Sequence, residues 1–278
     1  MAAWTDSHVH IWTPDTEAYP VLPGTDFGGR RPADFGPEVL AAVARPSGVE
    51  RFVLVAHQLY YGADNSYMLD ELAQQPNIFR IVAFVDHRDP NVGERMAELQ
   101  TEGVVGFRIA PEPDTAATWL QDDGYRAMFE AASATGQAMC PLVDPDGLGE
   151  IDRMCGEHPK VTVVIDHLAR IGAEGTIANA DVEALCALAK RPNVHVKLSA
   201  FNALGAKRPP HDDLIPVIES VTKAFGTQRL MWGSDAPYHL QGETYDDSLA
   251  VVRDGLDFIG DAEREDILSG TAGRVFFS

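Results

Sequence analysis

Several side chains capable of hydrolytic chemistry stand at the ends of short apolar segments. The first segment ends in Asp6-Ser7-His8-Val9-His10, with two histidines two residues apart. Residues two apart on a strand point to the same side. His8 and His10 would then face one space, where they can share a metal ion or polarise one oxygen. The alternative is a pair of surface histidines at a strand end.

Two later segments end in similar chemistry. His167 closes the apolar segment 161–167, and Asp235 closes 229–235 in the sequence Gly-Ser-Asp. A carboxylate at that point suits a general base that takes a proton from water. The alternatives are a hydrogen-bonded core histidine at 167 and a helix-capping aspartate at 235. We expect one catalytic group made of His8, His10, His167 and Asp235.

Basic residues at other segment ends are predicted to bind substrate. Arg108 ends an apolar segment and can hold a carboxylate through two parallel hydrogen bonds. Its alternative is an ion pair with Asp86 or Asp144. Lys197 is expected either to touch substrate or to form an internal ion pair. Arg170 is a further site for an anion, with simple solvation as its alternative.

Other polar residues at segment ends receive supporting roles. The pairs His57-Gln58 and Asp86-His87 are predicted either to cap helix ends or to support the reactive groups. Cys140 is predicted to be a buried apolar residue, because an apolar environment is common for free cysteine.

The elements that must position these residues alternate regularly along the chain. Eight apolar segments rich in Val, Ile and Phe are separated by amphipathic stretches, and near-continuous apolar strands are typical of a parallel sheet covered on both faces. The apolar segments are 5–11, 51–57, 78–86, 104–110, 137–143, 161–167, 193–200 and 229–235. Helices are predicted at 64–75, from Asp89 to before Gly103, at 123–135, at 179–191 and at 261–276.

Eight strand–helix units predict a single-domain (β/α)8 TIM barrel over residues 1–278, with a doubly wound open sheet as the alternative. The extra C-terminal helix at 261–276 should pack under the barrel. Residues 12–36 are rich in Pro, Gly and Asp, and we expect a long loop that is either a lid or a surface insertion. In such a barrel, the polar residues at the strand ends would meet at one mouth.

Composition limits the classes of partner. The 278 residues carry a formal net charge of −20, which disfavours nucleic acid and anionic membranes. The three cysteines have no Cys-x-x-Cys spacing, so a reduced, cytoplasmic protein is expected. No targeting segment or membrane span is apparent. The expected partner is a small carboxylated or hydroxylated molecule, and association into a homo-oligomer stays open.

The motifs together resemble a known family. Asp-Ser-His-Val-His-Ile-Trp at 6–12, Gly-Phe-Arg at 106–108, Ile-Asp-His-Leu-Ala-Arg at 165–170, Val-Lys-Leu-Ser at 196–199 and Gly-Ser-Asp-Ala-Pro at 233–237 are similar to the amidohydrolase superfamily. The resemblance is greatest to the branch that includes pyrone-dicarboxylate lactonase and the sugar-acid lactonases. It implies a (β/α)8 barrel and hydrolysis of a small ester, lactone or amide.

One departure from the family bears on metal content. Members with two metal ions use a lysine or glutamate on strand four and a histidine on strand five. This chain has Arg108 on the fourth segment and no histidine in 137–143, so at most one ion is expected. Zn²⁺ or Mn²⁺ could be held by His8, His10, His167 and Asp235. Catalysis without metal stays open.

The sequence therefore predicts a lactonase-like hydrolase. Asp235 would accept a proton from the attacking water, and the three histidines would stabilise the oxyanion directly or through one metal ion. One alternative is a metal-dependent decarboxylase of a muconate-type or aromatic acid. Another is a catalytically silent barrel that binds a small ligand, which ranks last because every reactive residue is present.

Overall fold

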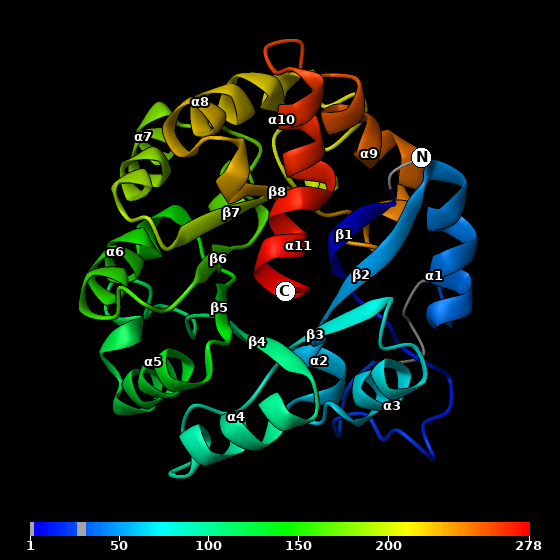
Figure 1. Cartoon of the computed structure of the whole chain (residues 1–278), viewed down its shortest axis with the longest axis vertical. Coiled ribbons are helices and arrows are strands. Elements are labelled where there is room, and N and C mark those ends of the chain that lie inside the picture. Colours follow the sequence, from blue (N-terminus) through cyan, green and yellow to red (C-terminus); the bar gives the residue numbers. More distant parts are fainter. Residues whose placement is uncertain (1–2, 27–31) are drawn as a thin grey trace.

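Eight parallel strands follow one another around a ring in chain order, with helices on the outside (Figure 1). The structure is a computed structural model that describes residues 3–26 and 32–278. The strands are β1 (Trp4–Val9), β2 (Val49–Val55), β3 (Phe79–Ala83), β4 (Val104–Ile109), β5 (Ala138–Pro141), β6 (Val163–Ile165), β7 (Val194–Leu198) and β8 (Leu230–Trp232). A parallel bridge between Val9 and Ala236 joins the last strand end to the first. The predicted (β/α)8 barrel is confirmed, and the open-sheet alternative is wrong.

The outer layer consists of helices that follow the strands. They are α1 (Pro37–Ala44), α2 (Gln58–Tyr61), α3 (Ser66–Gln74), α4 (Val92–Thr101), α5 (Asp123–Thr135), α6 (Leu148–Glu157), α7 (Asn179–Ala187), α8 (Ile215–Phe225), α9 (Tyr245–Arg253), α10 (Asp261–Glu265) and α11 (Thr271–Phe276). α5 has the predicted bounds because both of its ends carry local signals. The Asp122 carboxylate accepts from the Gly124 N–H at 2.7 Å, and Gly136 ends the helix with φ of 78°.

Two predicted helices begin later than expected for a shared reason. The carboxylates of Asp64 and Asp89 accept from N–H groups two residues ahead, on Ser66 and Asn91. Such a turn places the aspartate before the helix instead of within it. α7 is shorter than predicted because residues Leu188–Lys190 tighten into a 3₁₀ turn.

The C-terminal helix closes one end of the barrel. In Figure 1, α11 crosses the centre of the ring, and it continues α10 through a π-helical turn over Asp266–Gly270. Phe276 and Ala272 are buried with apolar side chains of the barrel interior, including Val53 and Met231. The prediction that this helix packs under the barrel is confirmed, and Cys140 is buried in the same cluster, as expected.

The long segment between β1 and α1 packs against α2, α3 and His57 at the end of β2. Trp12 and Phe35 pair at its base and are fully buried. Tyr19 packs on Tyr67 of α3, with ring centres 4.8 Å apart. Residues 27–31 of this segment lie outside the described part of the chain. Of the described residues in 12–36, none lines the central cavity, but Thr25 donates to the carbonyl of Leu59, which does, so both the lid and the surface insertion stay open.

Within residues 3–26 and 32–278, every helix is too short or too polar to cross a membrane.

Candidate active site

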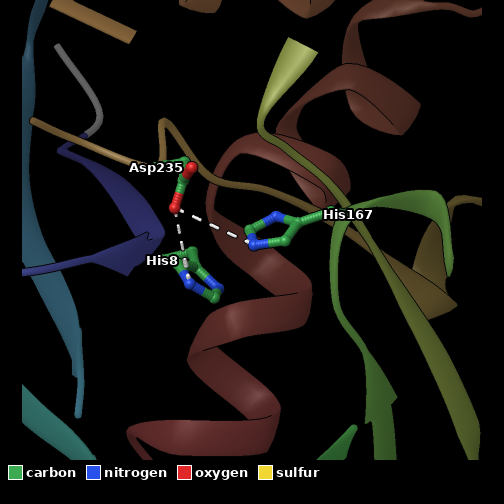
Figure 2. Close-up of side chains that lie close together, drawn as sticks. All are labelled: His8, His167 and Asp235. Atoms are coloured by element: carbon green, nitrogen blue, oxygen red, sulfur yellow. Dashed lines mark ion pairs between the residues drawn. The ribbon is translucent and has the colours of Figure 1, made fainter. Parts of the chain in front are cut away.

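Three histidines converge on one carboxylate oxygen at the carboxyl ends of the strands. The Nε2 atoms of His8, His10 and His167 lie 3.7, 3.4 and 3.8 Å from Oδ1 of Asp235. Figure 2 shows His8 and His167 approaching Asp235 from opposite elements of the barrel. The four residues lie at or just beyond the carboxyl ends of β1, β6 and β8, so the expected meeting at one mouth is observed. Their chemical roles stay predictions.

The ends of β1 and β8 are joined by a buried aspartate. Asp6 Oδ1 accepts from the N–H groups of His8 and Ser234, at 3.0 and 2.9 Å, and its Oδ2 accepts from the Tyr245 hydroxyl at 2.7 Å. Gly233 permits the close contact, because a Cβ there would lie 2.9 Å from the His8 Cβ. These contacts fix His8 and Asp235 relative to each other.

Each imidazole is oriented through its other nitrogen. His10 Nδ1 donates to the Val55 carbonyl at 2.8 Å, so its Nε2 faces Asp235. His167 Nδ1 bonds the Ser199 hydroxyl at 2.8 Å. Such outer hydrogen bonds set the tautomer and the ring orientation of a functional histidine.

His167 begins a turn with unusual backbone geometry. His167, Leu168, Ala169 and Arg170 all have φ between 52° and 54°. L-residues disfavour this left-handed conformation by roughly 1–2 kcal/mol each. Asp235 has φ of 62° as well. The backbone at these strand ends is held in a costly conformation that directs both side chains into the barrel mouth.

A buried ion pair lies directly beneath His8. Lys197 Nζ is 3.0 Å from Asp166 Oδ1, and both side chains are 0% exposed. The same Nζ lies 3.1 Å from His8 Nδ1 and 5.7 Å from the centre of the Phe276 ring. Burial raises the pKa of Asp166, but attraction to Lys197 and His8 outweighs it, so the carboxyl pKa lies well below its ordinary value. The internal ion pair expected as one of the two alternatives for Lys197 is present, and its contact with substrate stays a prediction.

Arg108 lies on the opposite side of His8 from Lys197. Its guanidinium is almost fully buried and its Nη1 is 3.4 Å from His8 Nε2. The carboxylates proposed as alternative partners are engaged elsewhere, since Asp86 pairs with Arg88 and Asp144 pairs with Arg170 at 3.0 Å. The ion-pair alternative for Arg108 is therefore wrong, and its guanidinium faces the cavity.

Of the four converging residues, His10, His167 and Asp235 line a cavity of about 880 Å³. Arg170 also lines it, and its guanidinium pairs with the Asp144 carboxylate at 3.0 Å; its role as an anion site stays a prediction. His57 and Tyr238 also line the cavity and are hydrogen-bonded to each other. Burial and the nearby His10 lower the pKa of His57 to about 3, so its ring is neutral.

Sequence reasoning assigned His57 a supporting role and gave Tyr238 none. The signal for His57 was its place at the end of β2, which is the same kind of position that His167 occupies after β6. Tyr238 follows Asp235 by three residues within an irregular turn, so no periodic pattern marked it.

The charge state of the site follows from burial and attraction. Burial raises the pKa of Asp235, but attraction to His167, the hydrogen bond with His10 and attraction to His8 outweigh it. The Asp235 pKa lies below its ordinary value, so this group is a carboxylate. Burial lowers the pKa of His167 to about 4, so its ring is neutral near pH 7.

Comparisons with known proteins match this architecture. The amidohydrolase family pattern covers residues 5–277. The chain belongs to the amidohydrolase family.

Individual relatives of this amidohydrolase span nearly its whole length. It is 30% identical over 236 residues to an L-fucono-1,5-lactonase from Burkholderia ambifaria, covering 84% of this chain and 79% of that one. It is 28% identical to an L-fucono-1,5-lactonase from Burkholderia multivorans, covering 98% and 95%. An amidohydrolase structure from Burkholderia multivorans with bound zinc superposes with a TM-score of 0.83 at 26% identity, covering 99% of each chain.

The donor set of this amidohydrolase suits one divalent cation. Donor atoms of His8, His167 and Asp235 lie within 4.8 Å of one another. Tetrahedral ligands with bonds of about 2.0–2.1 Å lie about 3.4 Å apart, close to the observed separations from Asp235 Oδ1. The Nδ1 atom of His10 is engaged with the Val55 carbonyl, which leaves its Nε2 atom, 3.4 Å from that oxygen, as a further ligand atom.

Two features disfavour a second ion at this centre. Arg108, a permanent cation, stands on β4 where metal pairs need a bridging ligand, and Asp166 is committed to Lys197. That at most one ion binds stays a prediction.

Proposed function

We propose that this amidohydrolase hydrolyses a small lactone, with Asp235 as the general base. The observation that supports this most directly is the convergence of three imidazole Nε2 atoms on one carboxylate, with the Arg108 guanidinium beside His8 and a cavity of about 880 Å³ adjoining the group. The two lactonase-named relatives support the same chemistry.

In this mechanism, water attacks the lactone carbonyl carbon while Asp235 accepts its proton. The carbonyl oxygen gains negative charge and lies among the imidazoles, with Arg108 offering fixed N–H donors. As the carbon–oxygen ring bond breaks, Asp235 returns the proton to the leaving ring oxygen, which becomes a hydroxyl. The product is a hydroxy acid, whose carboxyl group then loses its remaining proton to solvent, and Asp235 is again a carboxylate for the next water.

We propose that His8, His10, His167 and Asp235 would hold one Zn²⁺ or Mn²⁺. Such an ion supplies Lewis-acid polarisation of the substrate carbonyl when it is bound.

The charges of the cavity favour an uncharged, hydroxylated lactone over a dicarboxylate. Of the cations that line the cavity, Arg170 pairs with Asp144, which leaves Arg108 and Lys207 without an ion pair among the described residues. Glu174 and Asp235 add negative charge to the same walls. We further infer a cytoplasmic location, since the three cysteines are unpaired, as is usual in a reducing compartment.

The test is a panel of lactones offered to metal-stripped and metal-restored protein. We expect at least one lactone to be hydrolysed, with Asp235→Asn lowering kcat by about 10²–10⁴-fold, the usual effect of removing a general base. Asp146→Asn removes an exposed carboxylate and serves as the control. Carbon dioxide release from muconate-type or aromatic acids without lactone turnover would establish the decarboxylase instead. Ligand binding without turnover of any compound would establish a silent barrel.

A further inference from the structure

A second hollow of about 490 Å³ opens beside Asp235 and is lined by residues that carry buried polar atoms without partners among the described residues. It shares Asn202, Lys207, Asp235 and Tyr238 with the central cavity, so the two spaces adjoin at the general base. We propose that this hollow, which we call the side pocket, is a subsite that binds hydroxyl groups of the substrate. This inference rests on the proposed lactone hydrolysis and adds where the rest of the substrate lies.

Three buried polar side chains determine the hydrogen-bonding properties of the side pocket. His239 is 0% exposed, and among residues 3–26 and 32–278 neither of its ring nitrogens has a hydrogen-bond partner. The Glu243 side chain is 2% exposed, and its Oε2 accepts from His211 Nε2 at 2.7 Å. Glu243 Oε1 and Asn202 Oδ1 are buried and, within the same described residues, unpartnered.

Leaving such groups unsatisfied is costly. A buried polar atom without a partner costs roughly 1–3 kcal/mol, so native proteins satisfy nearly all of them. Four unpartnered atoms on three residues around one hollow indicate that another molecule completes their hydrogen bonds.

The hydrogen-bond donor and acceptor types of these atoms favour the binding of hydroxyl groups. Glu243 Oε1 and Asn202 Oδ1 only accept hydrogen bonds, whereas a neutral imidazole such as His239 donates at one nitrogen and accepts at the other. A hydroxyl group donates and accepts as well, and two neighbouring hydroxyls can serve this set together. A substrate carboxylate would be repelled by Glu243, and Lys207 on the same wall opposes an ammonium group.

The position of the side pocket fits a ring already held for attack. A lactone whose carbonyl carbon lies at Asp235 reaches both spaces, because Asp235 lines each of them. Hydroxyl groups carried on the ring or on a short arm would then enter between Tyr238 and Asn202. The subsite would contribute to selectivity for polyhydroxylated lactones over plain ones.

The experiment compares two kinds of six-membered lactone in matched variants. The hydroxylated probe is the best substrate among a set of hexono- and pentono-1,5-lactones, and the plain probe is δ-valerolactone. We expect Glu243→Gln and Asn202→Leu each to lower kcat/KM for the hydroxylated probe by about 10–100-fold, because loss of a partner for a substrate hydroxyl is strongly discriminated. The value for δ-valerolactone should change less than about twofold. Glu219→Gln, the same chemical change on the exposed side of α8, is the control and should alter neither value.

The outcomes separate the subsite from the reaction. Equal losses on both probes, or no loss on either, would overturn the subsite while the hydrolase stands. Wild-type protein inactive on every lactone would refute the proposed function instead. In that case calorimetry with the corresponding aldonic acids decides the subsite, since a Kd unchanged by Glu243→Gln and Asn202→Leu would overturn it and a weakened Kd would support it.

Discussion

Lys197 and Asp166 form an ion pair that no solvent reaches, directly under a histidine of the site. We expect Lys197→Met to lower the free energy of unfolding by about 3–5 kcal/mol, because it leaves the Asp166 carboxylate buried and unpaired. Denaturant unfolding measures this change. The double variant Lys197→Met with Asp166→Leu should recover part of the loss, since it removes both charges. A single variant as stable as the wild type would contradict the prediction.

Arg108 is the residue whose loss should affect binding and not folding. It makes no ion pair among the described residues, and its guanidinium faces the cavity beside His8. For Arg108→Met we expect kcat/KM to fall by the equivalent of about 2–5 kcal/mol while the melting temperature is nearly unchanged. Steady-state kinetics and thermal unfolding together test this. A variant that melts early but turns over normally would remove Arg108 from the site.

At the residue level, the sequence predicted where the reactive side chains lie better than which residues they contact. His8, His167 and Asp235 were recognisable because they end apolar strands, and the barrel brings such ends together. The partners of Lys197 and Arg170 could not be predicted, because they depend on the heights at which neighbouring strands end. The unpartnered atoms of the side pocket lie in irregular loops, where no periodic pattern marks direction.

Among the elements, α11 has the clearest energetic role. Phe276 fills the lower end of the barrel with apolar side chains of five strands around it. Phe276→Ala should lower the free energy of unfolding by about 3–5 kcal/mol, as is usual when a buried aromatic ring is removed. Urea unfolding is the measurement. Phe277→Ala, at a half-buried ring on the next residue, is the control. An equal loss of unfolding free energy in that variant would argue against a specific role for Phe276 in closing the barrel.

The elements themselves were largely predictable, with one exception. The strands follow from apolar runs and α5 follows from its caps, because both signals are local. The left-handed turn at His167–Arg170 was not predictable, since Leu168 and Ala169 are residue types that disfavour positive φ. Only the surrounding barrel can hold the chain in that conformation.

At the scale of the whole molecule, buried neutral histidines make stability depend on pH. Burial lowers the pKa of His167, His195 and His239 to about 4. The unfolded chain, with histidine pKa near 6.5, binds more protons than the folded chain between about pH 4 and 6.5. Asp6 acts in the opposite direction, because burial raises its pKa to about 6 and the folded state then binds the extra proton.

We therefore expect the histidines to lower the free energy of unfolding as the pH falls from about 6.5 to 4. His195 lies on β7 outside the catalytic group, with Arg229 and Arg274 adding to the effect of burial. Unfolding curves at several pH values should show a smaller acid loss for His195→Gln than for the wild type. Identical pH profiles for the two proteins would contradict the assignment.

Closure of one end of the barrel by α11 determines how substrate and product enter and leave. With Phe276 closing the lower end, the mouth serves as both entrance and exit, so one molecule must depart before another can arrive. Under the proposed reaction, an uncharged ring enters and an anion leaves. A protein with a formal charge of −20 repels that anion, while the incoming neutral ring feels no such force. Hydrolysis therefore converts a neutral ligand into an anion, and this change of charge favours release of the product from the cavity.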